Sequence, residues 1–278
     1  MDMTQVPHHP CLAYPLDEYH HILPDPECGP AHDIIGGEPS AKGKWPWVVA
    51  IVHQDTGSFI CGGSLVQKQW VLTAAHCLHG APADLKIAVK VAAYNLTAND
   101  EAERIPIEKI IEHPDYVPSQ STNGVHDLSL LKLERPSDLS DPCISTIDLP
   151  PITHEFSYSL LCWIIGWGKT DPSNEGISEI LNERRVNVLK NDECQTRWDV
   201  SPVKPTINYY NVCVDEEDET SACYGDSGSP MQCYLPFIGK WVFGGVSSWG
   251  SGACTQFPSV YMRVSSYNSW IRYILISE

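Results

Sequence analysis

The chain has few basic residues. Its 278 residues include 18 Lys and Arg against 35 Asp and Glu, which gives a formal net charge of −17 at pH 7. Proteins that bind nucleic acid neutralise its phosphates with Lys and Arg, so this balance argues against nucleic-acid binding. A large negative charge also favours solubility and repels anionic surfaces. We therefore expect neither nucleic acid nor membrane among the partners of this protein.

Long apolar segments are missing as well. No apolar run approaches the roughly 20 residues of a membrane span, and the first residues lead into Pro- and His-containing sequence rather than into the apolar core of a signal peptide. Eleven cysteines nevertheless indicate an oxidising compartment. We give the cysteines more weight and expect a secreted, extracellular protein whose leader is not visible in this sequence.

Residues 1–33 show little apolar periodicity. They contain six prolines and five histidines, namely His8, His9, His20, His21 and His32. A segment of this composition buries too little apolar surface to fold by itself, so we predict a pro-segment over residues 1–33. Its histidines could bind metal, but such tracts are usually solvated, and we expect neither a metal nor a cofactor.

From residue 34 onward, short apolar runs alternate with turn residues. The runs lie at 48–52, 70–74, 87–91, 128–133, 160–165, 186–189 and 240–246. This spacing indicates an all-β sandwich or barrel, and the content of 42 % apolar residues can supply one large core or two smaller ones. Residues 267–275 change to a helical period, which predicts a C-terminal amphipathic helix capped by Ser265 or Ser266.

The segment CYGDSGSP at residues 223–230 places Ser227 among glycines. Glycines allow a tight backbone path that exposes main-chain N–H groups. If the N–H groups of Gly225 and Ser227 point to one spot beside the hydroxyl, they form an oxyanion hole, in which one donor is typically worth about 3–4 kcal/mol. The alternative is an ordinary surface turn.

A serine becomes a good nucleophile only when a base takes its proton. His76 follows an apolar run within VLTAAHC, and Asp127 stands at the start of an apolar run within HDLSLLKL. An imidazole and a carboxylate that holds its tautomer would complete a catalytic triad. Taken alone, His76 would more often be structural, and Asp127 is one of many acidic residues.

In this order, the three segments resemble the chymotrypsin-like serine proteases, in particular chymotrypsins and chymotrypsin-like pancreatic elastases. The resemblance covers residues 34–276 and includes the sequences IIGG at 34, WPW at 45, GWG at 166 and SWG at 248. It implies two packed six-stranded antiparallel β-barrels with a C-terminal helix. We expect the N-terminal barrel over residues 34–143, and the C-terminal barrel and helix over residues 144–278, of a protease domain at 34–278.

The resemblance also implies a mechanism and its activation. His76 would accept the Ser227 proton, Asp127 would orient the imidazole, and an acyl-enzyme would follow. Cleavage before Ile34 would free an α-amine that pairs with Asp226, and breaking such a buried pair costs roughly 3–5 kcal/mol. Asp33 precedes Ile34 where most relatives have Arg or Lys, so the activating protease is not a tryptic one, or the start of this chain is not the natural precursor.

The expected specificity pocket has small polar walls. The resemblance places its floor at Ser221, where trypsin-like relatives have an aspartate, and its other residues at Ser247, Ser248, Trp249, Gly250 and Ser259. We therefore expect cleavage after Leu, Met, Phe or Tyr. The acidic run at 215–219 leaves alternatives open: it is a solvated face, it favours basic substrates through its field, or it brings an acid into the pocket and makes the protein trypsin-like.

Disulfides are assigned by resemblance alone. The expected pairs are Cys61–Cys77, Cys162–Cys233, Cys194–Cys213, Cys223–Cys254 and Cys28–Cys143, which leaves Cys11 over. Asn95 lies in a glycosylation sequon. Ala93 stands where calcium-binding relatives have a carboxylate, which argues against a calcium site.

The expected partners are protein or peptide substrates and protein protease inhibitors, bound by a monomer. A rival hypothesis is a protease-shaped binding or regulatory protein without activity, because a fold alone does not prove an activity. The two departures Asp33 and Ser229, the latter where glycine is usual, keep this rival open. The presence of all three triad residue types argues against it.

Overall fold

The computed structural model describes residues 37–82, 84–97, 103–119, 124–152, 154–169, 176–215, 224–251 and 256–278. Several predictions lie outside these ranges. They concern the pro-segment with Cys11 and Cys28, the activation residue Ile34, the pocket floor Ser221, the Cys223–Cys254 pair and residues 216–219 of the acidic run.

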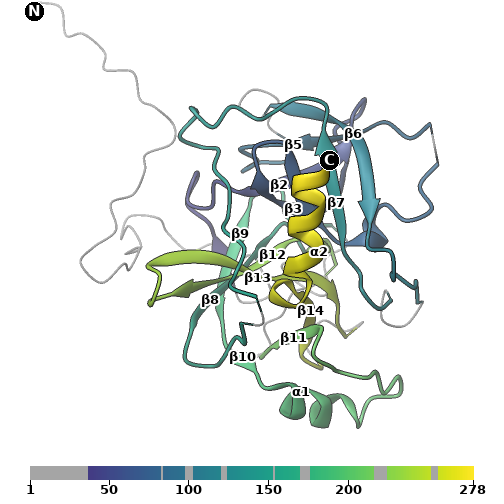
Figure 1. Ribbon diagram of the computed structural model, residues 1–278, viewed down its shortest axis with the longest axis vertical. Coiled ribbons are helices and arrows are strands. Elements are labelled where there is room, and N and C mark those ends of the chain that lie inside the picture. Colours follow the sequence, from purple (N-terminus) through teal and green to yellow (C-terminus); the bar gives the residue numbers. More distant parts are fainter. Residues whose placement is uncertain are drawn as a thin grey trace, which may run out of the picture.

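A closed six-stranded antiparallel barrel forms the N-terminal half (Figure 1). Its strands, in the spatial order β2-β3-β4-β7-β6-β5, are β2 (Val48–His53), β3 (Phe59–Gln67), β4 (Trp70–Thr73), β7 (Ser129–Leu133), β6 (Arg104–Glu112) and β5 (Ile87–Lys90). Alternate side chains fill the interior with branched apolar residues such as Ile51, Leu65, Val89 and Leu131. Closure of the barrel leaves no sheet edge exposed.

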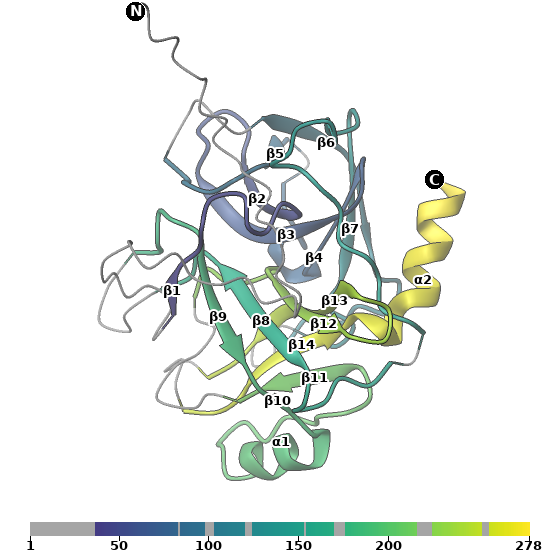
Figure 2. The ribbon, with the colours of Figure 1, turned by 90° about the vertical axis from the view of Figure 1, so that its left-hand side faces the viewer.

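An eight-stranded antiparallel sheet forms the C-terminal half. In spatial order its strands are β1 (Glu38–Pro39), β9 (Asn182–Val186), β8 (Leu161–Gly166), β12 (Pro230–Leu235), β13 (Lys240–Trp249), β14 (Ser259–Arg263), β11 (Asn211–Val214) and β10 (Val188–Leu189). The resemblance implied six strands here, whereas the described sheet has eight. The two-residue strands β1 and β10 extend the sheet at its ends. Because β1 pairs with β9, the start of the described chain lies against the second sheet, before the chain enters the first barrel (Figure 2).

The helix α2 (Val264–Ser277) confirms the predicted C-terminal helix. Its buried face, which includes Tyr267 and Ile271, packs on a core shared by both halves, with Leu72 and Leu130 from the first barrel and Phe243 from the second sheet. The predicted caps are wrong. Ser265 and Ser266 lie inside the helix, and their hydroxyls donate to the carbonyls of His154 and Tyr209 in neighbouring loops.

The described part of the chain holds two further, short helical segments: η1 (Ala75–Cys77), a single 3-10 turn, and α1 (Asn191–Trp198). No helix in the described ranges is long and apolar enough to cross a membrane.

Three disulfides join described cysteines. Cys61–Cys77 ties β3 to η1, Cys162–Cys233 joins two directly paired residues of β8 and β12, and Cys194–Cys213 ties α1 to β11. These are three of the pairs that the resemblance implied. Cys143 is also disulfide-bonded, and its partner is not among the described cysteines.

Candidate active site

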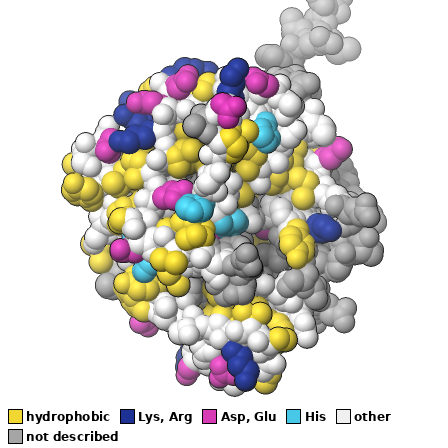
Figure 3. Space-filling view, turned by 90° about the vertical axis from the view of Figure 1, so that its right-hand side faces the viewer, with side chains coloured by type: hydrophobic (Ala, Val, Ile, Leu, Met, Phe, Trp, Pro, Cys, Tyr) yellow, Lys and Arg dark blue, Asp and Glu magenta, His cyan; other side chains and the backbone are white. Residues whose placement is uncertain are grey.

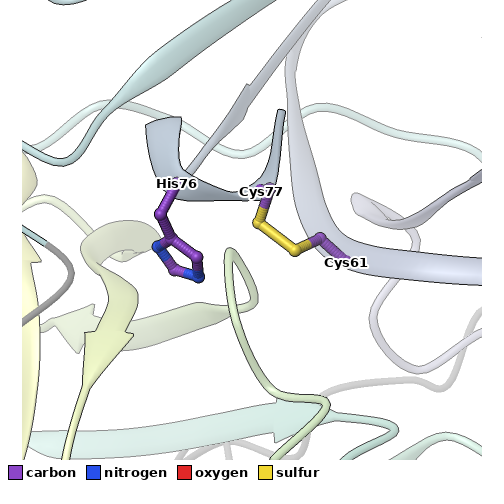
Figure 4. A group of neighbouring side chains, drawn as sticks. All are labelled: Cys61, His76 and Cys77. Carbon is purple, nitrogen blue, oxygen red and sulfur yellow. A yellow bond between two sulfur atoms is a disulfide. The ribbon is translucent and has the colours of Figure 1, made fainter. Parts of the chain in front are cut away.

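The turn η1 holds His76 at the end of β4. The neighbouring Cys77 is bonded to Cys61 in β3, so a covalent link as well as the strand fixes the backbone beside the histidine. The side chain of His76 is 19 % exposed, which leaves part of the ring open to solvent. Figure 4 shows the ring beside the disulfide and separate from it.

The carboxylate of Asp127 is completely buried and faces His76. Its Oδ1 accepts the backbone N–H of His76 at 2.7 Å, and its Oδ2 lies 2.7 Å from Nδ1 of the ring. Two contacts to one residue fix both the backbone and the imidazole. A neutral imidazole donates from Nδ1 in this arrangement and presents an unprotonated Nε2, which is the tautomer of a general base.

A third donor reaches Asp127 from the other half of the molecule. The hydroxyl of Ser248 donates to Oδ2 at 2.5 Å. A register shift between Ser247 and Trp249 makes Ser248 a bulge residue between β13 and β14, and a bulge re-aims a side chain. The sequence reasoning placed Ser248 only at the substrate-binding edge and missed this hydroxyl contact, since a bulge leaves no signal in the sequence.

The loop that carries Ser227 packs against the first barrel. The N–H of Gly62 in β3 donates to the carbonyl of Ser227 at 2.9 Å, and the N–H of Gly228 donates to the carbonyl of Ser247 at 2.9 Å. Gly228 has a φ of 77°, and a Cβ there would collide with Thr73 Oγ1 and the Gly62 carbonyl. Only glycine therefore lets this loop approach the strand that leads to His76.

Gly225, the other predicted oxyanion donor, has a φ of 101°. This left-handed backbone is accessible to glycine at little cost. Ser229, where the resemblance implies a glycine, has no positive φ, so its backbone conformation is an ordinary one. Its hydroxyl is buried against Gly62 without a hydrogen-bond partner.

Asp226 is buried, with 4 % of its surface exposed. The N–H of Gly168 donates to its Oδ1 at 2.9 Å, and a Cβ on Gly166 or Gly168 would collide with the carboxylate. These glycines, at the end of β8 and two residues beyond it, thus leave room for a charge beside the serine loop. The amine expected to pair with it belongs to Ile34, which lies outside the described residues.

The described walls of the expected pocket come from β13 and β14. Ser247 and Ser259 are both buried, and a Cβ on the exposed Gly250 would lie 3.5 Å from Ser259 Oγ. Behind them, the rings of Trp198 and Trp249 meet at 5.1 Å, and Trp198 also stacks on Phe257 at 4.8 Å. Trp198 donates from Nε1 to the carbonyl of Pro258, so this aromatic stack braces the wall.

In the first barrel, Tyr116 lies near Asp127 and contacts the ring of His79. Burial raises the pKa of Tyr116 to about 12, with further contributions from the negative charges of Asp127 and Glu112. The tyrosine therefore remains a neutral phenol. His79 contacts the Tyr116 ring edge-on and lies 3.0 Å from the Glu112 carboxylate. Figure 3 shows histidine side chains on one face of the protein, beside an acidic group and among hydrophobic side chains.

Metal binding has little support around His76. Cys61, His76 and Cys77 bring their ligand atoms within 4.8 Å of one another, but both sulfurs belong to one disulfide. Metals bind thiolates, so this group is not a metal site. A cavity of about 530 Å³ lies between α2 and residues 147–151. None of the candidate catalytic or described pocket residues lines this cavity, so it is separate from the candidate active site.

Lys90, the last residue of β5, binds the loop that follows this strand. Lys90 is buried, and its ammonium donates to the carbonyls of Asn95 at 2.9 Å and Leu96 at 3.3 Å. Nearby, Oδ1 of Asn95 accepts from both the N–H and the hydroxyl of Thr97 at 2.8 Å. The sequon residues are thus ordered in an Asx turn.

The chain is similar to known proteins over most of its length. The family model described as Trypsin matches residues 34–271. A mouse (Mus musculus) protein named Tryptase is 36 % identical over 260 residues, which cover 88 % of this chain and 90 % of the mouse protein.

Proposed function

Because this chain belongs to the trypsin family of serine proteases, we propose that it is a secreted endopeptidase that hydrolyses peptide bonds through an acyl-enzyme. One observation carries the proposal: the carboxylate of the buried Asp127 lies 2.7 Å from both the backbone nitrogen and Nδ1 of His76. This arrangement prepares a base and is hard to explain as structural, since it leaves part of the imidazole open to solvent.

Each residue then has one task. His76 Nε2 takes the proton of Ser227 as its hydroxyl oxygen attacks the substrate carbonyl carbon. The N–H groups of Gly225 and Ser227 hold the resulting oxyanion, and Asp127 stabilises the imidazolium. The imidazolium then protonates the leaving amine, and water hydrolyses the acyl-enzyme by the same steps in reverse. The main chain of Ser248 and Gly250 pairs with the substrate backbone as an added strand.

Activation follows from cleavage before Ile34. The new α-amine pairs with Asp226, whose burial beside Gly168 makes a charged partner valuable. This scheme divides the chain into a pro-segment at 1–33 and a protease domain at 34–278, with its halves meeting near residues 143 and 144. A Cys28–Cys143 bond keeps the pro-segment attached after the cut.

The pocket is proposed to take Leu, Met, Phe or Tyr. Ser247 and Ser259 supply hydroxyls but no charge, and Gly250 leaves the entrance open. The rival trypsin-like specificity needs an acid from residues 215–219. Asp215, the only member of that run in the described ranges, forms an ion pair with Arg197 on α1, which argues against this carboxylate reaching the pocket.

Further parts of the proposal concern processing and partners. Cys223–Cys254 brackets the serine loop and the pocket, and Asn95 carries a glycan. The protein acts as a monomer on protein or peptide substrates and is inhibited by protein protease inhibitors.

A serine-reactive fluorophosphonate probe tests the function. The full chain, with a cleavable sequence engineered in place of residues 29–33, is labelled before and after the cut. We expect labelling only after the cut, and none in Ser227→Ala. Absence of labelling in the cut protein would support the inactive binding module instead. A peptide-library digest of the cut protein then reads the pocket preference directly.

A further inference from the structure

The residue before the triad aspartate has an unusual backbone. His126 has a φ of 54°, a left-handed conformation that is uncommon for residues other than glycine. The N–H of Leu128 donates to the carbonyl of His126 at 2.8 Å, so the backbone turns tightly around Asp127. The direction of the Asp127 side chain therefore depends on the conformation held at His126.

The ring of His126 is clamped on several sides. It stacks on His113 with ring centroids 5.1 Å apart and an interplanar angle of 17°. It meets Tyr210 edge-on at 4.6 Å, and its Nδ1 lies 3.2 Å from the hydroxyl of Tyr267. Tyr267 is buried in α2, and its hydroxyl also contacts the sulfur of Met262.

The members of this clamp come from distant parts of the chain. His113 follows β6 and His126 precedes β7 in the first barrel, whereas Tyr210 precedes β11 and Tyr267 belongs to α2 in the second half. The clamp thus crosses from one half to the other immediately behind the triad. Interactions that join the two halves at this point hold the loop of Asp127 in one position relative to the sheet that carries Ser227.

Packing and a hydrogen bond hold the clamp together. Burial raises the pKa of Tyr267, with further contributions from Tyr210 and Asp127, so its hydroxyl stays protonated. Burial and the neighbouring His126 lower the pKa of His113, so His113 is neutral at neutral pH. The charge of Asp127 is accordingly left to its own donors, His76 and Ser248.

We propose that His126 is a positioning residue for peptide hydrolysis: its clamped ring holds the left-handed backbone that points the Asp127 carboxylate at His76. This inference rests on the proposed protease function. His126 itself touches neither substrate nor reacting atoms.

Two variants separate the ring from the backbone. In His126→Gly and His126→Asn the left-handed conformation is tolerated, but the clamp is lost. We expect kcat per titrated active site to fall about 10- to 100-fold, the size of effect that small misplacements of catalytic groups produce, with KM unchanged. Tyr267→Phe removes only the hydroxyl, and we expect kcat to fall roughly 2- to 10-fold, as for one lost hydrogen bond.

A second readout does not depend on turnover. The proton that His76 Nδ1 shares with Asp127 gives a strongly downfield proton NMR signal without substrate. We expect this signal to broaden or disappear in His126→Gly and His126→Asn, while thermal unfolding stays cooperative. The matched control is Tyr209→Phe, because Tyr209 contacts Tyr210 but not the His126 ring; we expect it to retain kcat and the signal.

Full kcat and an unchanged NMR signal in both His126 variants would overturn the inference. It would also be overturned if the variants lost activity only because fewer active sites could be titrated, with kcat per site unchanged. If His126→Gly does not fold, His126→Asn and Tyr267→Phe decide by the same criteria. The unsubstituted protein in the same assays reports on the proposed function. If it neither hydrolyses peptides nor reacts with the serine probe, the protease proposal fails, whereas normal activity with insensitive variants sinks this inference alone.

Discussion

The Ser248 hydroxyl and the Asp127 carboxylate meet across 2.5 Å. Ser248 belongs to β13 of the second sheet, and Asp127 precedes β7 of the first barrel. The base side of the proposed triad is therefore stabilised from the half of the molecule that carries the nucleophile. Both partners are almost fully buried, so loss of the hydroxyl leaves a charged acceptor with one donor fewer.

Ser248→Ala tests this contact. A hydrogen bond to a charged group is worth about 1.5–3 kcal/mol, so we expect the free energy of unfolding to fall by about that amount and kcat to decrease roughly tenfold. Urea unfolding and steady-state kinetics measure the two effects. Ser248→Thr keeps a hydroxyl and should recover much of the loss; equal defects in both variants would show that the hydroxyl is not responsible.

Removal of the disulfide beside His76 has a predictable cost. Cys61 and Cys77 are 16 residues apart, and a loop of this length gives a stabilisation of about 3 kcal/mol. We expect the double variant Cys61→Ser, Cys77→Ser to lose about that much stability and to unfold at lower denaturant concentration. The Cys194→Ser, Cys213→Ser variant, with a separation of 19, serves as a control with a similar loop. We expect a comparable loss of stability there, but a smaller effect on kcat because it lies away from His76.

The pocket entrance is tested by Gly250→Val. The Cβ of the valine would already contact Ser259 at 3.5 Å, and its methyl groups would project further into the space. We expect kcat/KM for peptides with Phe or Tyr before the scissile bond to fall at least tenfold relative to peptides with Ala, an effect typical of altered hydrophobic pockets. Unchanged relative rates would place the pocket elsewhere.

Stability should decrease on acidification. Burial and the charge of Arg263 lower the pKa of His154, so the folded protein binds fewer protons at this site than the unfolded chain. Protonation therefore favours unfolding as pH falls below the ordinary histidine value of about 6.5. Its Nε2 is buried without a hydrogen-bond partner, and its ring contacts Phe156 and Phe237, so a phenyl ring suits the site.

The measurement is the unfolding midpoint of His154→Phe and the unsubstituted protein at pH 7 and pH 5. We expect the difference in unfolding midpoint between His154→Phe and the unsubstituted protein to shift in favour of the variant from pH 7 to pH 5. If the unfolding midpoint of the variant falls relative to that of the unsubstituted protein between pH 7 and pH 5, the assignment is contradicted.

The sequence predicted the parts of the site that local chemistry dictates. Gly225 and Gly228 reveal the serine loop because only glycine accepts those backbone angles, and the apolar runs before His76 and after Asp127 reveal the strands that hold them. The contacts of Ser248 and His126 were not predictable, since they depend on a bulge and on side chains from remote segments. The Ser265 and Ser266 caps failed for the same reason: neighbouring loops took their hydroxyls.

The core shared by the two halves has a consequence for any nick in the chain. His76 and Asp127 are supplied by the first barrel, and Ser227 by the second sheet, while Leu72, Leu130 and Phe243 lie in one continuous apolar cluster. Two fragments cut between β7 and β8 would each expose half of that cluster and hold an incomplete set of reactive groups. If peptide hydrolysis is recovered when the two fragments are mixed, its rate measures how much of the protein has reassembled.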